Sequence, residues 1–363
     1  MTELELKLDR LKDLLARYGT DAMLLRRVSS FAWATCGAAA YINTASTEGV
    51  GSLLITPTGR YLVTDNIEAP RFEKEEHLAA QGWEFRVTAW HESNPAVADL
   101  TRGLKLAADG PYPGAIDLSG EMARLRANLL PEEGERYRQV SRLCAEAINA
   151  AIRAVRPGQA EYEIAALLDR ETQARDVQPI VNLIATDDRI YNFRHPLPTA
   201  KRLDKYAMLI LCGRKYGLVT SVTRLAYFGR LPDDLRRKMI GVASIDAAFI
   251  AATRPGRALN QVFQRATEAY AMTGFPNEWH LHHQGGPAGY EPREWLATPA
   301  STEIVTAGQV YAWNPSITGA KSEDTILIGP SGNEVLTAMP DWPMLIVEAD
   351  GQNIPRPAIL EVV

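Results

Sequence analysis

The sequence predicts an α/β N-terminal domain over residues 1–130 and an α+β C-terminal domain over residues 131–363 with an internal pseudo-twofold duplication. The chain has 363 residues, which is enough for two domains of ordinary size. In the first third, short apolar runs alternate with segments of helical periodicity, as in an α/β fold. In the remainder, two helix–Arg-Pro-Gly–helix units lie about a hundred residues apart, which indicates a duplication.

The N-terminal domain begins with a predicted helix, because leucines recur at helical spacing from Leu4 to Leu15 and Gly19 follows as a C-cap. Two apolar runs around Pro57-Thr58-Gly59 predict a β-hairpin. The other expected elements are strands at 22–25, 85–90 and 115–118 and helices at 67–78 and 95–106. Leu130-Pro131-Glu132-Glu133 then marks the boundary and opens a new helix.

In the C-terminal domain, the apolar residues from Tyr137 to Val155 form one stripe of a long amphipathic helix. Arg156-Pro157-Gly158 ends it, and a second helix is expected over 161–174. The same order returns as a helix over 235–253, Arg254-Pro255-Gly256 and a helix over 259–272. Because strand-like segments with glycine and histidine follow each unit, we expect a pseudo-symmetric domain.

Composition excludes several classes of protein. Apolar residues make up 46% of the chain and charged residues 23%, and a net charge of -5 offers no basic surface for nucleic acid. The N-terminus lacks the pattern of a signal peptide, and no apolar run reaches membrane-spanning length. The isolated Cys36, Cys144 and Cys212 are typical of reduced thiols. We therefore expect a cytoplasmic protein that binds neither nucleic acid nor membrane.

The best single candidate for a site is the segment from Trp279 to Gly289, which contains three of the six histidines and then a run of glycines. Histidine is suited to proton transfer and metal binding near neutral pH, and glycine lets the backbone approach a ligand. A surface loop with a chance cluster of histidines is the alternative. His280 and His282 are expected on a strand, where they share a face and at least one of them is structural.

An ordered set of motifs runs through the whole chain. Pro131-Glu132-Glu133 opens a helix, and Arg-Pro-Gly, His195-Pro196-Leu197-Pro198, Thr223-Arg224, the histidine cluster, Asn314-Pro315 and Glu323-Asp324 follow in that order. In this the sequence resembles the family of aminopeptidase P, prolidase, methionine aminopeptidase and creatinase. The resemblance implies a pita-bread fold for the C-terminal domain.

The resemblance also implies where metal ligands would lie. Metallopeptidases of this family hold two metal ions with two aspartates, a histidine and two glutamates, which activate a water for attack on an amide. Carried over by position, the aspartates fall on Leu211 and Val222, and the remaining ligands on His283, Asn314 and Glu323. Two of the five ligands remain, and Leu211 and Val222 would present apolar surface where the metals bind. We therefore expect no metal and no other cofactor.

Creatinase is the metal-free member of the family, and similarity to it implies that His195 acts as general acid/base. His283 and Glu323 are the other residues expected to be catalytic. Each has a structural alternative. His195 suits a loop histidine held by a backbone carbonyl, and His283 suits a structural histidine behind the site. Glu323 suits a salt bridge to Lys321 or Arg224. The residues expected to bind substrate are Asn314, Tyr290, Arg224 and Arg194, of which Tyr290 and Arg224 also suit purely structural roles.

The function predicted from these residues is a metal-independent, creatinase-like hydrolase or lyase that acts on a C–N bond of a small-molecule or short-peptide substrate. Creatine itself is not expected, because Thr223 stands where creatinase has a glutamate. One alternative is a non-catalytic pseudo-peptidase that binds a small ligand or peptide. Another is an Xaa-Pro dipeptidase or aminopeptidase with one metal ion on His283 and Glu323. The resemblance further implies a homodimer.

Overall fold

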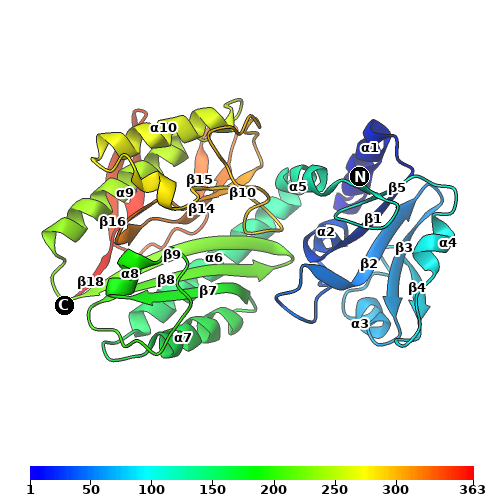
Figure 1. Ribbon diagram of the computed structural model, residues 1–363, viewed down its shortest axis with the longest axis horizontal. Coiled ribbons are helices and arrows are strands. Elements are labelled where there is room, and N and C mark those ends of the chain that lie inside the picture. The colour runs from blue at the N-terminus through cyan, green and yellow to red at the C-terminus, as the bar shows by residue number, and fades with distance from the viewer. The chain divides into compact units, whose positions relative to one another are not determined.

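A computed structural model describes all residues from Met1 to Val363. The chain divides into two compact units, Met1–Ala127 and Asn128–Val363 (Figure 1). This division lies within a few residues of the predicted boundary after residue 130. Among the helices of either unit, none combines the length and the apolar character needed to cross a bilayer.

The first unit is built on one mixed sheet with the strand order β4-β3-β2-β1-β5-β6. The predicted hairpin around Pro57 is present, since β2 and β3 pair antiparallel with Thr56 opposite Gly59. Gly19 ends the first helix in the left-handed conformation at φ 62°, as its spacing predicts. The strands are β1 (Ala22–Arg27), β2 (Glu48–Thr56), β3 (Gly59–Asp65), β4 (Glu84–Thr88), β5 (Leu106–Ala108) and β6 (Ile116–Asp117). The helices are α1 (Glu3–Tyr18), α2 (Val28–Ala34), α3 (Ala69–Lys74), α4 (Ala96–Leu100) and α5 (Ser119–Ala127).

Two predicted helices of this unit are shorter in the structure. The helix expected over 67–78 is confined to α3, and His77 beyond it has a φ of 53°, which no right-handed helix contains. The helix expected over 95–106 ends as α4, because Gly103 turns the chain at φ 79° into strand β5. The apolar periodicity correctly predicts the first turns of both helices. Residues with positive φ then reverse the backbone, so both helices end early.

The second unit repeats one order of elements, as the two Arg-Pro-Gly units predict. Helices α6 (Pro131–Ala154) and α7 (Glu161–Gln173) precede strands β7 (Gln178–Thr186), β8 (Tyr206–Lys215) and β9 (Leu218–Phe228), with the short α8 (Asp188–Asn192) after β7. Helices α9 (Asp233–Ala252) and α10 (Leu259–Met272) precede strands β10 (Gly285–Ala288), β11 (Val310–Trp313), β14 (Asp324–Ile328) and β15 (Asn333–Val335) (Figure 1). Each half is thus a helix pair followed by an antiparallel sheet.

Of the remaining strands, one joins the first sheet and four form two separate hairpins. The C-terminal β18 (Leu360–Val362) adds to β9 in parallel, which gives the order β18-β9-β8-β7. The second sheet has the order β10-β11-β14-β15. Two small hairpins pack against α9, β12 (Ser316–Ile317) with β13 (Ala320–Lys321), and β16 (Met344–Ala349) with β17 (Gln352–Pro357).

The two sheets meet at the isolated bridge between Thr223 of β9 and Glu323, the residue before β14. The Thr223 amide donates to the Glu323 carbonyl at 3.2 Å. Two residues further along each strand, the Thr325 hydroxyl donates to the Ser221 carbonyl at 2.8 Å. The ends of the two halves that carry Thr223 and Glu323 are therefore held side by side.

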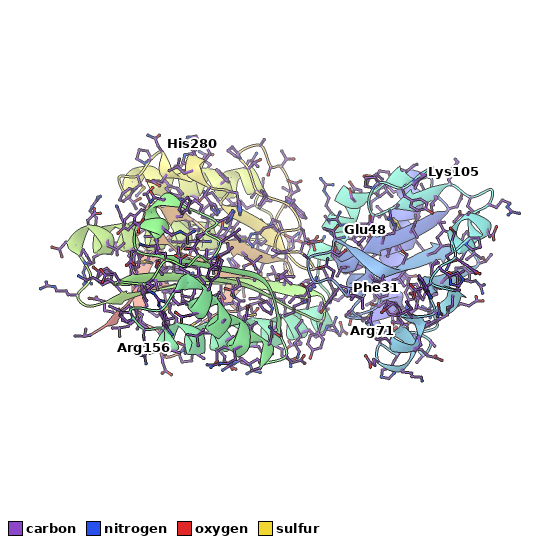
Figure 2. The ribbon with its side chains drawn as sticks, turned by 60° about the horizontal axis from the view of Figure 1, so that its bottom comes forward. Phe31, Glu48, Arg71, Lys105, Arg156 and His280 are labelled. Atoms are coloured by element: carbon purple, nitrogen blue, oxygen red, sulfur yellow. The ribbon has the colours of Figure 1, made fainter.

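The histidine-rich segment differs from its expected form. Glu278–Leu281 is a 3-10 helix (η1), and the strand begins only at Gly285, so His280 and His282 do not share a strand face. His280 is exposed at the edge of the molecule (Figure 2). The prediction of a strand here was wrong because a 3-10 turn places residues two apart on different sides.

Candidate active site

Three histidines from two distant segments meet in the second unit. His195 follows α8, and His282 and His283 lie between η1 and β10. The Nε2 atoms of His195 and His282 are 3.0 Å apart, and the rings of His195 and His283 are 5.6 Å apart. The structure thus brings together His195 and His283, both expected in the site. It adds His282, which was predicted to share a strand face with His280, at least one of the two being structural.

Two glycines fix where His283 lies. Gly285 has a φ of 101°, and a Cβ there would lie 2.1 Å from the Ala312 carbonyl oxygen of β11. Gly286 has a φ of 157°, and a Cβ there would lie 2.5 Å from the Trp295 oxygen. Only glycine permits β10 to pack this closely between its neighbours. The close packing holds the preceding histidines in place.

Gln284 locks the backbone beneath the same histidines. Its side-chain oxygen accepts a hydrogen bond from the Tyr270 hydroxyl at 2.7 Å, and its nitrogen donates to the His282 carbonyl at 2.6 Å. Tyr270 is buried on α10, so the second helix pair supports the site directly.

The three imidazoles are held in the neutral form. Burial, followed by the positive charge of Lys321, lowers the pKa of His282 to about 2. Burial and Arg293 lower the pKa of His283 to about 4. The pKa of His195 is also lowered, by burial and then by Lys321. A neutral imidazole can accept a proton, and the buried Nδ1 atoms of His282 and His283 have no hydrogen-bond partner in the protein.

Glu323 lies beside this cluster and is held by two cations. Arg293 Nη2 is 3.0 Å from Glu323 Oε1, and Lys321 Nζ is 3.0 Å from Oε2. The Thr223 hydroxyl donates to Oε2 at 2.5 Å. Burial raises the pKa of Glu323, but Lys321, Arg293 and this hydrogen bond together lower it to about 2. Glu323 is therefore ionised at neutral pH and serves as an acceptor.

The predicted structural alternative for Glu323 is a salt bridge to Lys321 or Arg224. The structure has the first and not the second, and it adds Arg293. Arg293 lies in the connection after β10, where no motif or periodicity distinguishes it from a surface arginine. Only a count of the charges around Glu323 would have identified Arg293, and that count can be made only once the fold is known.

Asn314 lies between the histidines and Glu323. Trp313 pairs with Asp324 across β11 and β14, so Asn314 and Glu323 are the next opposed positions. The Asn314 amide donates to the Gln284 carbonyl at 3.1 Å, which ties it to the histidine segment. The Asn314 side-chain oxygen is buried and has no hydrogen-bond partner. It is therefore an unused acceptor.

Leu211 and Val222 do not face the site, which corrects the sequence prediction. Gly213, two residues after Leu211, points towards Cys144 of α6, and a Cβ on it would lie 2.4 Å from the Cys144 sulfur. Thr220, two residues before Val222, bonds Ser141 of α6 at 2.8 Å. Since residues two apart share a strand face, Leu211 and Val222 face helix α6.

The residues that face Glu323 from this hairpin are their neighbours. Cys212 Sγ and Ser221 Oγ are 3.3 Å apart, and Ser221 Oγ accepts a hydrogen bond from Arg293 at 2.9 Å. Burial and then the charge of Glu323 raise the pKa of the Cys212 thiol. The surface is thus polar and uncharged, where apolar side chains were expected.

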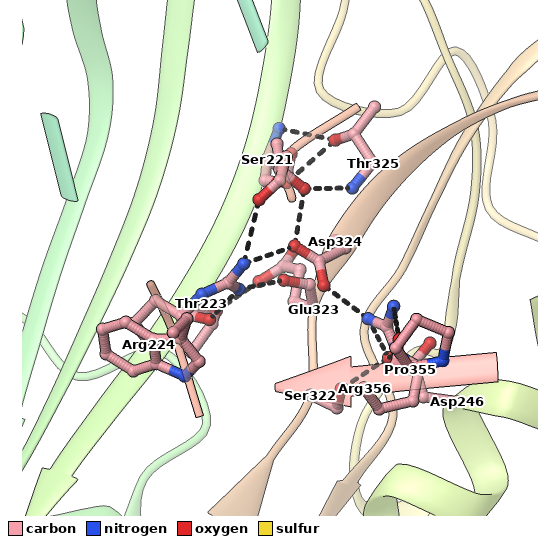
Figure 3. A network of polar contacts seen from close by, with 12 residues as sticks. Ser221, Thr223, Arg224, Asp246, Ser322, Glu323, Asp324, Thr325, Pro355 and Arg356 are labelled. Carbon is pink, nitrogen blue, oxygen red and sulfur yellow. Dashed lines mark hydrogen bonds and ion pairs between the residues drawn. The ribbon is translucent and has the colours of Figure 1, made fainter. Parts of the chain in front are cut away.

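Arg224 has a structural role, contrary to the prediction that it binds substrate. It is 2% exposed and pairs with Asp324 at 2.8 Å. Asp324 also pairs with Arg356, which pairs with Asp246 at 2.6 Å (Figure 3). Arg224 further donates to the carbonyls of Thr223 and Thr337. These bonds hold Arg224 on the side of the strand away from Glu323.

Arg194 and Tyr290 have protein partners of their own. Arg194 donates to Glu278 and to Thr318, both at 3.0 Å, which fastens the loop of His195 to η1. Arg194 therefore positions the neighbouring His195. The buried Tyr290 hydroxyl donates to Glu133 of α6 at 2.6 Å, which favours the packing alternative for this residue.

The side chains present do not fit a pair of divalent cations. Each oxygen of Glu323 already has a cationic partner, and Cys212, Ser221 and Asn314 carry no charge at neutral pH. Two metal ions need several anionic oxygen donors to offset their charge. The ring nitrogens of His195, His282 and His283 all lie within 4.8 Å of one another, which suits at most one ion.

Comparisons with known proteins agree with this fold. Residues 135–330 match the model of metallopeptidase family M24. The chain is 24% identical over 223 residues to an Xaa-Pro dipeptidase of Pyrococcus furiosus, covering 59% of this chain and 64% of that protein. It is 28% identical over 140 residues to an agropine synthesis cyclase of Rhizobium rhizogenes, covering 36% of this chain and 35% of the cyclase. The match thus spans less than two thirds of either relative.

Among solved structures, a prolidase from Thermococcus sibiricus superposes with a TM-score of 0.80 at 15% identity, covering 100% of both chains. At this identity the likeness shows the fold alone. The second unit accordingly has the predicted pita-bread fold with its internal duplication, and it follows an α/β unit in the sequence.

Proposed function

The chain belongs to metallopeptidase family M24, and on that premise we propose that it is a metal-independent hydrolase or lyase that cleaves a C–N bond of a small polar substrate. The observation that carries the proposal is the replacement of a metal-binding donor set by side-chain cations, with Lys321 and Arg293 on the two oxygens of Glu323. Beside them lie three neutral histidines.

His195 is the proton carrier in this proposal. It is the only exposed histidine of the three, so a substrate reaches it first. Its Nε2 shares one hydrogen with His282 Nε2 across 3.0 Å, which orients the ring, and Arg194 anchors its loop. A positioned base of this kind contributes about a hundred- to ten-thousand-fold to a rate.

Lys321 and Arg293 supply the positive charge. When water adds to the carbon of a C=O or C=N group, negative charge develops on the oxygen or on the nitrogen of that group, and fixed cations stabilise it best where little water is present. Their side chains are only 6% and 9% exposed. Glu323, whose pKa is about 2, holds these two cations in place and accepts hydrogen bonds; it does not carry the proton. His283 and Asn314 are the remaining residues that contact the substrate in this proposal.

The test is a screen of amidino, ureido and N-acyl compounds with protein treated with a chelator. On any activity found, His195→Asn is expected to lower kcat about a hundred- to ten-thousand-fold. His280→Asn is the matched control, because His280 lies in the same histidine-rich segment and is exposed outside the cluster. Undiminished activity in His195→Asn would remove His195 from the mechanism.

One observation favours a second candidate function. The three histidine nitrogens lie close enough to hold a single metal ion, although the predicted pair of His283 and Glu323 does not suit one. The activity would then be that of an Xaa-Pro dipeptidase with one metal ion; the relative from Pyrococcus furiosus carries the name Xaa-Pro dipeptidase. Elemental analysis of protein purified without chelators, with one metal per chain and chelator-sensitive cleavage of an Xaa-Pro dipeptide, would replace the first proposal by this one.

The resemblance to creatinase also leads us to propose a homodimer in the cytoplasm. Sedimentation velocity at micromolar concentration tests the dimer, and a single species of monomer mass would contradict it.

A further inference from the structure

A second cavity in the unit of residues 128–363 lies apart from the candidate active site. It has a volume of about 550 Å³ and is bounded by the end of α6, the start of α9, the segment that leads into β16, and β18 (Figure 1). This volume is in the range of about 300–1,000 Å³ that is usual for small-molecule sites. None of its lining residues is a histidine or belongs to the cluster around Glu323, so the cavity is a separate candidate for a ligand.

The wall of this cavity is largely apolar. Three segments of the chain contribute its apolar side chains, which include Leu231, Met239, Ile240, Trp342, Leu345 and Ile359. The Trp342 indole N–H donates to the Ala358 carbonyl at 2.9 Å, which fixes the ring within the wall. Ile240 is 50% exposed on α9. An apolar group that covers such a surface removes it from water and gains free energy.

The buried Arg224 lies between the cavity and the candidate active site. Its guanidinium is 5.7 Å from the centre of the Trp342 ring. Its Nη1 donates to the carbonyls of Thr223 and Glu323, at 2.8 and 3.3 Å. A ligand in the cavity therefore contacts Trp342 and not Glu323.

Two of the four charged residues around the cavity already bind each other. Arg236 donates to the Glu361 carboxylate at 2.9 Å, and the Leu231 amide donates to the same carboxylate at 2.9 Å. The Leu231 amide first, then Arg236 and the nearby Arg230, lower the pKa of Glu361. A ligand is therefore not needed to neutralise Arg236 or Glu361.

The other two charged residues, Arg153 and Asp341, are exposed and form no ion pair. Arg153 Nε donates to Asn149 at 2.9 Å, and its Nη2 donates to the backbone carbonyl of Asp341 at 2.8 Å. Both hydrogens of Arg153 Nη1 remain free, since a guanidinium has five N–H groups. The Asp341 carboxylate accepts no hydrogen bond within the protein. One cation and one carboxylate are thus both available at the edge of an apolar cavity.

We propose that this cavity binds an α-amino acid with an apolar side chain. Arg153 binds the carboxylate, Asp341 binds the ammonium group, and the apolar wall contacts the side chain. An amino acid carries both charges at neutral pH, whereas a ligand with only one of them would leave Arg153 or Asp341 without a partner. The site shares no residue with the candidate active site, so this inference does not rest on the proposed function.

The binding test compares four ligands by calorimetry on the full chain. L-Phenylalanine has all three features, N-acetyl-L-phenylalanine lacks the ammonium group, L-phenylalaninamide lacks the carboxylate, and L-serine lacks the apolar side chain. We expect L-phenylalanine to bind at least about threefold more tightly than the acetyl compound and the amide, as for exposed ion pairs. It should bind at least about tenfold more tightly than L-serine. Equal affinity for the acid and the amide, or no binding of L-phenylalanine, overturns the proposal.

Two variants each remove one charge from the edge of the cavity. Arg153→Met should abolish the discrimination between L-phenylalanine and its amide. Asp341→Asn should abolish the discrimination between L-phenylalanine and its acetyl derivative. Arg142→Met, which removes an exposed arginine paired with Glu146 on the same helix as Arg153, is the matched control and should change neither. Discrimination that persists in both charge variants overturns the assignment of Arg153 and Asp341.

A further pair of variants separates this cavity from the candidate active site, where an amino acid could also bind. Ile240→Glu places a carboxylate on the apolar wall and should weaken the binding of L-phenylalanine at least about tenfold. His195→Asn should leave that affinity unchanged. The reverse result would place L-phenylalanine in the candidate active site and overturn the proposal.

Discussion

Two neighbouring residues, Glu323 and Asp324, belong to two buried clusters of charge that differ in one respect. Asp324 joins Arg224, Arg356 and Asp246, so that two cations meet two carboxylates (Figure 3). Glu323 joins Lys321 and Arg293, so that two cations meet one carboxylate. Successive residues of a strand point to opposite faces, which keeps the clusters separate. The balanced cluster supports the fold, and the unbalanced one lies in the candidate active site.

The hydrogen bonds follow the same division. Asp324 accepts from Thr337, Arg224 and Arg356, and Asp246 accepts from Ser322 and Arg356. In this balanced cluster Arg224 Nε is buried without a partner, whereas on the other face four atoms are: Asn314 Oδ1, Arg293 Nε and the Nδ1 atoms of His282 and His283. Because such groups cost free energy to bury, their concentration on one face is a reason to look for a function there.

Breaking the balanced cluster should have the largest effect. Asp324→Asn leaves Arg224 and Arg356 buried with only Asp246 to offset them. Loss of one partner from a buried ion pair costs about 3–5 kcal/mol in the free energy of unfolding. Urea denaturation followed by circular dichroism measures it.

Two controls accompany this variant. Glu334→Gln removes an exposed partner of Arg138 and should change the free energy of unfolding by less than about 0.5 kcal/mol. Lys321→Met removes a charge from the cluster that has one in excess, and it should cost less than Asp324→Asn. The comparison of the two clusters fails if Lys321→Met is the more destabilising change.

Acidification should produce a smaller loss of stability that originates in the unbalanced face. The folded pKa values of His282 and His283, about 2 and about 4, lie below the ordinary 6.5, so the unfolded chain binds protons first. The free energy of unfolding should therefore fall as the pH drops through 6.5. Glu323, with a pKa of about 2 against an ordinary 4.5, adds to the loss only below pH 4.5.

The window between pH 6.5 and pH 4.5 thus isolates the histidines. Urea titrations of the wild type and of the variant His282→Gln/His283→Gln across this window measure the effect. The variant should show a flatter dependence on pH, and an identical dependence would mean that other groups are responsible.

The smallest change in the free energy of unfolding is expected when a new carboxylate is introduced next to a cation. Ser221→Asp adds a negative charge beside Arg293, whose Nη1 lies 2.9 Å from the serine oxygen, and brings the cluster to zero net charge. We expect a change in the free energy of unfolding within about 1 kcal/mol. Val222→Asp, one residue further, buries a carboxylate against α6 and should cost more than about 4 kcal/mol. Thermal and urea denaturation of the pair decide which of the two residues faces the site.

The helices show what the sequence predicts well. The helix expected over 259–272 has the same bounds in the structure. An apolar stripe defines its length, and the Arg-Pro-Gly turn just before it defines its start. The meeting of His195 with His283 followed from resemblance, since no local pattern relates residues so far apart.

The site predictions that were wrong or missing depended on strand register and on the local sum of charges. Leu211 and Val222 were placed in the site by counting residues, and a slip of one residue on a strand turns every side chain to the other face. Arg293 and Lys321 passed as ordinary charged residues, because only the fold shows that they share one carboxylate. The pattern of side-chain types is readable from the chain, whereas the local sum of charges is not.

The bridge between Thr223 and Glu323 has a consequence for folding kinetics. Its side-chain hydrogen bond joins positions 100 residues apart, one in each half of the duplicated unit. Closing so long a loop costs entropy that only well-formed halves can offset. We therefore expect the excess positive charge to be assembled late in folding, after the hydrophobic core of each half has formed.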